Sequence, residues 1–241
     1  MRIAIVSDIH SNLAAFQAVL RHAEKQGPLD EVWSLGDIVG YGPQPGECLE
    51  LLQEVATLSL AGNHDLAAIS AIPLRDFNPH AAAAARWTAT RLLPEEQAYI
   101  QSLSQVLVDG QFTLVHGSLR RPIWEYLVSE DAALEHFQLQ KTPFGLVGHS
   151  HLPLVARRDL SLAFLQDGDV IVLNPDEPLV LNPGSVGQPR DGDPRASYAV
   201  YDSAAATASF HRVAYDIPAT QKLMREAGLP MPLIARLERG L

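Results

Sequence analysis

Cysteine is almost absent from this chain, because Cys48 is the only one among 241 residues. No disulfide can therefore form within the chain, and the leucines around Cys48 predict that this thiol packs inside a helix. Long apolar runs are also missing, since no segment approaches the roughly 18 residues that a membrane span requires. The chain opens with neither the basic region nor the apolar stretch of a signal peptide. These absences predict a cytoplasmic protein that does not enter the membrane.

Basic residues are fewer than acidic ones, at 18 against 28, which gives a formal net charge of −10. This balance, without a clustered basic face, argues against a nucleic-acid partner. It still permits a small phosphorylated substrate, because bound metal ions would set the local field. Repeats and low-complexity stretches are lacking too, and the 47% apolar content suits a sizeable core. We therefore expect one domain over residues 1–241 and leave its oligomeric state open.

The first part of the chain alternates between strand-like and helix-like patterns. Short apolar runs predict strands at 3–7, 32–35, 57–61 and 144–147. Periodicity and capping residues predict helices at 12–26, 47–54, 81–93, 95–103 and 130–137. Strands at 106–108 and 112–115 flank Asp109-Gly110, which is a strong hairpin signal. The helices within about 66–104 stand between two polar motifs, so we expect them to form a helical cover over a site.

Beyond Pro153 the pattern changes to short strands separated by turn residues. These strands are predicted at 155–157, 162–165, 170–173, 180–182, 198–201 and 207–213. Asp167-Gly168 predicts a hairpin between the second and third of them, and two terminal helices begin at Pro218 and Pro230. An α/β first part followed by a β-rich second part predicts an α/β (α+β) fold with two stacked mixed sheets flanked by helices.

Short motifs of His, Asp, Asn and Gly follow five of the apolar runs. They are Asp8-Ile9-His10, Gly36-Asp37, Gly62-Asn63-His64-Asp65, His116-Gly117 and Gly148-His149-Ser150-His151. In extended backbone, residues i and i+2 point to the same face, so Asp8 and His10 could hold one ion. His149 and His151 repeat that spacing. Ligands gather at the carboxyl ends of strands in α/β sheets, so these motifs are expected to converge there.

The donors in these motifs are carboxylate or amide oxygens and imidazole nitrogens, with no sulfur. Such a set favours manganese, iron, zinc or nickel over calcium. Seven donors exceed what one tetrahedral ion takes, whereas two divalent ions that share a carboxylate use all of them. Two such ions would outweigh the charge of the two aspartates and would attract an anionic phosphoester.

In their order and composition, the motifs from Asp8 to His151 resemble those of the calcineurin-like metallophosphoesterase superfamily. Three segments are most similar to its small bacterial phosphodiesterase branch: Asp8–Asn12, Gly36–Pro43 and Asn182–Gly187. The resemblance implies a four-layer α/β/β/α sandwich. It also implies one metal on Asp8, His10 and His151, a second on Asn63, His116 and His149, and Asp37 bridging the two.

His64 has a separate role in this resemblance. Because it follows Asn63 directly, extended backbone would point its ring away from the second metal and toward the substrate. There it would protonate the leaving oxygen or stabilise the transition state. Asp65 either orients His64 or caps a helix or loop, and both alternatives stay open. Ser185 and Arg190 are weaker candidates for contact with a phosphate.

The resulting functional prediction is a binuclear phosphodiesterase in which a metal-bridging hydroxide attacks phosphorus in line and His64 assists. A non-catalytic metal-binding module on the same fold, like the retromer subunit of this superfamily, is one alternative. Retention of His64 and every ligand argues against it. A nuclease fits the acidic composition poorly. A protein or nucleotide phosphatase is a further alternative, although Gly36-Asp37 lacks the Asp-Arg-Gly ending common in that branch.

Four histidines lie outside the motifs. They are His22, His80, His136 and His211. Their positions on helices, before a helix or in a strand predict surface or capping roles.

Overall fold

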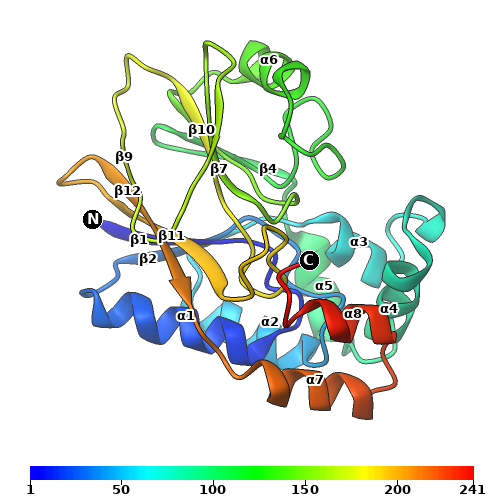
Figure 1. Cartoon of the computed structure of the whole chain (residues 1–241). Helices are drawn as coiled ribbons and strands as arrows, with labels where there is room; N and C mark the ends of the chain where they lie inside the picture. The colour runs from blue at the N-terminus through cyan, green and yellow to red at the C-terminus, as the bar shows by residue number, and fades with distance from the viewer.

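The computed structural model describes residues 1–241 and contains two mixed six-stranded sheets. The first sheet has the order β3 (Leu58–Ser59), β2 (Glu31–Ser34), β1 (Arg2–Val6), β11 (Ala196–Asp202), β12 (Thr207–Val213) and β9 (Val170–Val172). The second has the order β4 (Val106–Asp109), β5 (Phe112–Val115), β6 (Phe144–Leu146), β10 (Leu179–Pro183), β7 (Pro153–Arg157) and β8 (Leu162–Phe164). The sheets are stacked, and helices cover their outer faces (Figure 1).

Three neighbouring strands run parallel in each sheet. They are β1, β2 and β3 in the first sheet and β5, β6 and β10 in the second. Helices α1 (Leu13–Lys25) and α2 (Pro45–Val55) make the crossovers between β1, β2 and β3, as parallel pairing requires. Asn12 caps α1 as predicted, because its side chain accepts a 3.3 Å hydrogen bond from the Ala15 N–H. The hairpin of β4 and β5 around Asp109-Gly110 is also confirmed.

Alternating side chains of β1 enter two different apolar cores. Ala4 and Val6 pack with the apolar faces of α1 and α2. Ile3 and Ile5 point the other way and pack between the sheets, in the same cluster as Phe112 of β5. This period of two is what a strand buried on both faces requires. The inter-sheet core therefore holds the two sheets together.

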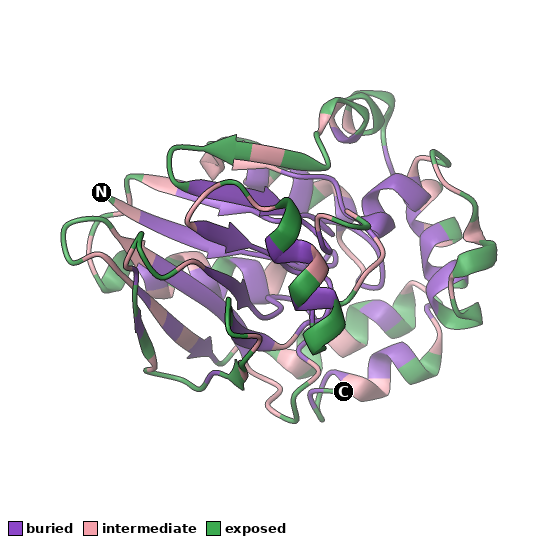
Figure 2. Ribbon diagram, turned by 90° about the horizontal axis from the view of Figure 1, so that it is seen from above, coloured by how far each residue is buried: buried purple, intermediate pink, exposed green.

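The outer face of the second sheet is covered by α6 (Glu130–Leu139). Ala133 and Phe137 of this helix pack in one cluster with residues of β5, β7 and β10. In Figure 1, α6 lies at the top over the second sheet and α1 lies at the bottom under the first. The central strands are buried and the helices keep exposed faces (Figure 2). The predicted α/β fold with two stacked mixed sheets in an α/β/β/α sandwich is confirmed.

The remaining helices gather at one end of the sandwich. α3 (Asn63–Ala68), the 3-10 turn η1 (Leu74–Asp76), α4 (Pro79–Ala89) and α5 (Pro94–Ser102) follow β3. α7 (Ile217–Glu226) and α8 (Met231–Arg236) end the chain. Ala81 and Ala84 of α4 pack in one cluster with Leu233 and Ile234 of α8. The carboxyl-terminal helices are thus fixed beside α4 (Figure 1).

The hairpin predicted at Asp167-Gly168 is wrong. β8 and β9 flank this turn, but β8 pairs with β7 in the second sheet and β9 pairs with β12 in the first. The turn residues do reverse the chain there, with Gly168 at φ +88°. A turn signal fixes only the local direction of the chain, so it could not show that the two strands join different sheets. The strand predicted at 57–61 is also shorter, because Leu60 makes only an isolated bridge to Ser104.

His136 does not have the surface or capping role predicted for it. Its side chain is fully buried, where it accepts a 3.2 Å hydrogen bond from the Leu119 N–H and lies 3.0 Å from Gln140 Oε1. The reason is that α6 turns this part of its surface toward Gly145 of β6.

No helix of the chain combines the length and the apolar character that crossing a bilayer demands.

Candidate metal centre

The carboxyl ends of the parallel strands of both sheets meet at one end of the sandwich. Asp8, Asp37 and Asn63 follow β1, β2 and β3, whereas His116 and His149 follow β5 and β6. Hydrogen bonds tie these loops to one another. The Asp8 N–H donates to the Gly36 carbonyl at 3.0 Å, and the Asn182 side chain donates to the Gly148 carbonyl at 2.7 Å. Residues remote in the chain are thereby brought to one place.

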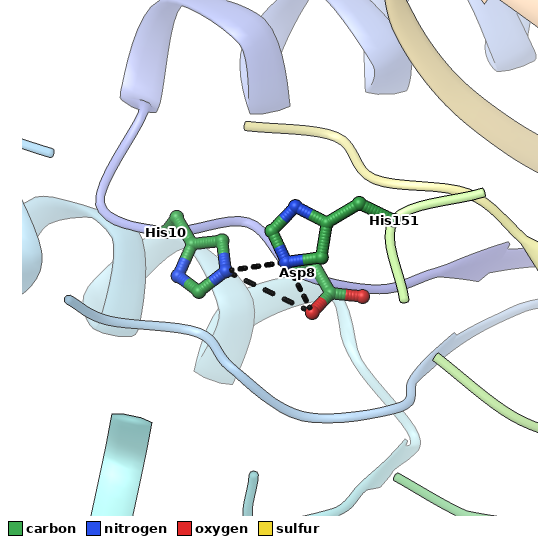
Figure 3. A group of neighbouring side chains, drawn as sticks. All are labelled: Asp8, His10 and His151. Carbon is green, nitrogen blue, oxygen red and sulfur yellow. Dashed lines mark hydrogen bonds and ion pairs between the residues drawn. The ribbon is translucent and has the colours of Figure 1, made fainter. Parts of the chain in front are cut away.

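Asp8, His10 and His151 form the first cluster (Figure 3). His151 Nε2 lies 3.1 Å from Asp8 Oδ1, and His10 Nε2 lies 3.7 Å from the same oxygen. The two Nε2 atoms are 3.1 Å apart. All three side chains are almost completely buried. Their ligand atoms therefore surround one small volume.

Backbone carbonyls fix the proton on the outer nitrogen of both imidazoles. His10 Nδ1 lies 3.2 Å from the Val39 carbonyl oxygen, and His151 Nδ1 lies 2.5 Å from that of Gln188. A carbonyl only accepts, so each Nδ1 carries the hydrogen and each Nε2 keeps a lone pair. Two lone pairs facing each other repel, whereas a cation between them is attracted to both. This carbonyl–imidazole arrangement is the one that orients histidines toward metals.

Asp37, His116 and His149 form the second cluster. Asp37 Oδ2 lies 3.3 Å from His116 Nε2, while His116 Nδ1 lies 2.8 Å from the Leu35 carbonyl oxygen. The same Oδ2 is 3.8 Å from Nε2 of His10 in the first cluster. One carboxylate oxygen therefore borders both clusters.

Several buried ligand atoms have no hydrogen-bond partner. They are Asp8 Oδ1, Asp37 Oδ2, Asn63 Oδ1 and His116 Nε2. The other oxygen of each carboxylate is occupied, because Asp8 Oδ2 accepts from the Ser7 hydroxyl at 2.6 Å and Asp37 Oδ1 accepts from the His64 N–H at 2.8 Å. Unpaired buried polar atoms are costly unless an ion satisfies them. The oxygen and nitrogen donors present fit divalent cations.

Burial keeps most of these imidazoles neutral. It lowers the pKa of His149 to about 3, with the nearby His116 adding to the effect, and it lowers the pKa values of His10 and His151. His116 differs: burial lowers its pKa too, but the charge and contact of Asp37, the charge of Asp8 and the Leu35 carbonyl together outweigh burial and raise the pKa to about 9, so a metal ion would have to displace this proton. Burial also opposes ionisation of Asp8, but the neighbouring His151 holds its pKa below the usual range. Neutral imidazoles and ionised carboxylates are the forms that bind metals.

The backbone at these motifs is not extended, contrary to the expectation for Asp8-x-His10 and His149-x-His151. Asp8, His10, His149 and His151 have φ values of 54°, 49°, 64° and 61°. These left-handed residues turn the chain sharply just past the strands, so alternation no longer decides where the side chains point. His149 and His151 accordingly belong to different clusters. Gly62 leaves space for the Asp37 carboxylate, because a Cβ atom at this position would overlap it.

A pocket of about 250 Å³ opens over the two clusters. Asp37, Asn63, His149 and His151 line it from the metal side. Its other lining residues are His64, Arg190, Tyr41, Asp76, Phe77, Asn78, Ala81, Trp124 and Tyr126. We call this cavity the active-site pocket.

His64 lines this pocket, but its backbone is helical instead of extended. α3 begins at Asn63, so His64 is the second residue of a helix whose first turn is held by Asp37 Oδ1. The ring contacts Tyr41 and Phe77, with centroid distances of 4.3 and 5.1 Å. Burial, opposed by the charge of Asp37, lowers the pKa of His64 to about 4.

The three weaker candidates occupy different positions. The Asp65 carboxylate accepts hydrogen bonds of 2.9 Å from the Val39 and Gly62 N–H groups, so it joins two loops and caps α3. Ser185 is fully buried and donates to the Asp8 carbonyl at 2.8 Å, away from the pocket. Arg190 does line the pocket and lies 3.4 Å from the Tyr41 hydroxyl.

Sequence reasoning missed three of the four residues in the aromatic wall of the pocket, whereas the position of Tyr126 soon after His116 suggests that it lines the pocket. Tyr41, Phe77 and Trp124 line it together with Tyr126, whose ring lies 4.4 Å from that of His149. Tyr41 stands within the Gly36–Pro43 segment, so its position beside a motif was an available signal. Phe77 lies in the segment after α3, twelve residues beyond Asp65, and the packing of that segment brings it to the pocket. Trp124 lies in the segment that follows β5 and His116.

The family model described as the calcineurin-like phosphoesterase superfamily domain matches residues 1–206. The chain belongs to this superfamily. This phosphoesterase is thus a metal-dependent phosphoric ester hydrolase, as the motifs predicted. Its sandwich matches the crystal structure of a metallophosphoesterase from Sphaerobacter thermophilus, with a TM-score of 0.92 and 48% identity over 100% of this chain and 99% of that one.

Two curated relatives extend the comparison. An uncharacterized protein of Methanocaldococcus jannaschii is 38% identical over 99% of this phosphoesterase and 98% of its own length. A symmetrical bis(5'-nucleosyl)-tetraphosphatase of Vibrio cholerae is 30% identical over 58% of this chain, and the match spans 52% of that enzyme.

Proposed function

We propose that this phosphoesterase is a binuclear phosphodiesterase with Asp37 bridging two cations. The observation that carries this proposal is the position of Asp37 Oδ2, 3.3 Å from His116 Nε2 in one cluster and 3.8 Å from His10 Nε2 in the other. Asp8, His10 and His151 would hold one ion. Asn63, His116 and His149 would hold the second, because Asn63 Oδ1 is buried, unpaired and on the wall of the same pocket.

Two divalent ions at these positions, of manganese, iron, zinc or nickel, would supply a bridging hydroxide for attack on phosphorus and would offset the charge of the ester. The chain's own groups act around the ester. Arg190 would donate to a non-bridging oxygen and set the orientation of the phosphate. From the side of the pocket formed by α3, His64 would assist the oxygen that departs, either by protonating it or, as the neutral imidazole that its low pKa favours, by donating a hydrogen bond to the developing charge.

The helical cover between about 66 and 104 would position the rest of the substrate. Phe77, Asn78 and Ala81 from this segment line the active-site pocket opposite the metal clusters. Phe77 and Trp124 pack edge to face at 5.3 Å, and Tyr126 is 47% exposed at the same pocket. Aromatic walls suit a substrate with a flat ring. Their presence and the Vibrio tetraphosphatase together favour small nucleotide esters.

The test is reconstitution of metal-free protein with each of the four metals, followed by assays on matched mono- and diesters of p-nitrophenol. We expect two ions per chain, measured by mass spectrometry, and faster turnover of the diester. A preference for the monoester would replace the diesterase assignment with a phosphatase. Two bound ions with no hydrolysis of any ester in a broad panel would favour the non-catalytic interaction module.

A further inference from the structure

Two arginines beside the active-site pocket share one neutral acceptor. Arg190 Nη2 and Arg236 Nη1 each lie 3.2 Å from Oε1 of Gln188. Neither guanidinium forms an ion pair with an acidic side chain. By contrast, three other arginines each form an ion pair with a carboxylate: Arg120, Arg195 and Arg212.

The two guanidiniums are also partly removed from water. Both are half-buried, and Nε of Arg190 is fully buried with no hydrogen-bond partner. Burial and the positive charge of Arg190 both lower the pKa of Arg236. Adjacent cations in such a place are stabilised when an anion binds between them, and guanidinium donors match the oxygens of a phosphate.

A second cavity of about 470 Å³ continues from this pair. Arg236, Arg239 and His80 line it, no acidic side chain does, and Leu241 with its terminal carboxylate is also in the lining. Asn78 lines both this second cavity and the active-site pocket, while Arg190 lines the active-site pocket. The two cavities are therefore neighbours, with Arg190 and Arg236 standing between them. In a chain of net charge −10, this is a local concentration of positive charge.

We infer that the second cavity is a subsite for a distal anionic group, such as a phosphate, on the same substrate whose ester occupies the active-site pocket. Arg236 is its main specificity-determining residue, and Arg190 faces both groups. This inference rests on the proposed phosphodiesterase function. It narrows the substrate class to esters that carry a further negative charge beyond the scissile phosphate.

The test uses a series of p-nitrophenyl alkyl phosphodiesters whose alkyl arms contain four to seven carbons, long enough that a terminal hydroxyl does not cyclise onto phosphorus. Each arm ends either in a phosphate or in a hydroxyl, and release of p-nitrophenol is measured. For at least one arm length, we expect the phosphate-ended ester to have a kcat/KM about ten- to a hundredfold above its hydroxyl-ended partner, the range of charge-assisted hydrogen bonds. In Arg236→Gln that ratio should fall to near one, and Arg236→Lys should retain part of it.

Arg225→Gln is the matched control, because Arg225 is exposed on α7 and lines neither cavity. It should keep the wild-type ratio, and thermal unfolding checks that each variant is folded. A wild-type ratio near one at every arm length, or an unchanged ratio in Arg236→Gln, would overturn the subsite. Inorganic phosphate that alters hydrolysis of the hydroxyl-ended esters in wild type but not in Arg236→Gln would instead assign the cavity to a free effector. Hydrolysis of the hydroxyl-ended esters separately shows whether the proposed function holds.

Discussion

The backbone N–H of His64 donates a 2.8 Å hydrogen bond to Oδ1 of Asp37. This bond leaves Oδ2 of the carboxylate turned toward both ligand clusters. It also joins the residue proposed to assist the leaving group to the residue proposed to bridge the ions. A displacement of α3 would therefore disturb both parts of the reaction together.

Asp37→Asn should remove metal from the whole centre. The amide has no charge to attract two cations, and its Nδ2 would turn a donor toward the ions or toward His64 N–H. We expect fewer than two ions per chain after dialysis, measured by mass spectrometry, and at least a roughly hundredfold loss of kcat/KM. Asp176→Asn, at an exposed position, should change neither quantity. Full metal content with wild-type turnover in Asp37→Asn would contradict the bridging role.

His64→Ala should keep the metal and lose turnover by about 10²–10⁴, the range for general acid–base groups. If the imidazole protonates the leaving oxygen, the loss must be larger for an alkoxide than for p-nitrophenolate, which departs without a proton. The measurement is kcat for one diester that releases an alkoxide and one that releases p-nitrophenolate, with metal content determined on the same samples. Equal losses for the two leaving groups, or no loss with the alkoxide, would show that the role is wrong.

Gly40→Ala should impair catalysis through the position of the His64 ring. Gly40 has φ +88°, and a Cβ atom there would lie 2.8 Å from His64 Nδ1. Gly168 also has φ +88°, but nothing lies within 4 Å of the corresponding point. Both alanine variants should lose about 1 kcal/mol of unfolding free energy from backbone strain. Only Gly40→Ala should lose turnover at full metal content. Equal kcat values in the two variants would argue against this coupling.

His136 should make the protein less stable as the pH falls. Burial, partly opposed by the hydrogen bond to Gln140, lowers the pKa of this imidazole to about 4. In the unfolded chain the pKa is about 6.5, so below that pH the unfolded state binds a proton that the folded state does not. Between pH 7 and pH 5 this difference removes about 2 kcal/mol of stability.

Urea unfolding of metal-free protein at both pH values measures this effect. His136→Gln should lose less free energy over the interval than wild type does, by about 2 kcal/mol. The histidines of the metal centre titrate in both proteins, so their contribution cancels in the comparison. His80→Gln, at an exposed position on α4, should behave like wild type. The same pH dependence in all three proteins would show that His136 is not responsible.

The sequence was sufficient to predict the architecture and that the residues of these motifs lie close together at one end of the sandwich. An apolar run that ends in Asp8, Asp37 or His116 predicts both a strand and the end of that strand that contributes to the site. The reason is that the carboxyl ends of parallel strands lie at the same edge of a sheet. The backbone conformation within the motifs could not be predicted in this way. The positive φ values of Asp8 and His10 depend on loops from other strands, such as the 3.0 Å hydrogen bond from the His10 N–H to the Asp37 carbonyl.

Other errors have the same non-local origin. Asp167-Gly168 turns the chain as its residues predict, but the choice of sheet for β9 is made by pairing with β12. His136 is buried because of how α6 docks, and Phe77 reaches the pocket because of how the segment after α3 folds back. In each case a partner distant in sequence decided the outcome.

Asp8 belongs to a loop of the first sheet, and His151, 3.1 Å away, belongs to a loop of the second. Ions held by both loops would join the two sheets at this end of the sandwich, in addition to the apolar core between the sheets. Neither sheet alone could bind these ions before it had packed against the other sheet. We therefore expect the centre to take up metal only after the two sheets have packed together, and chelation to loosen the sandwich first at this end.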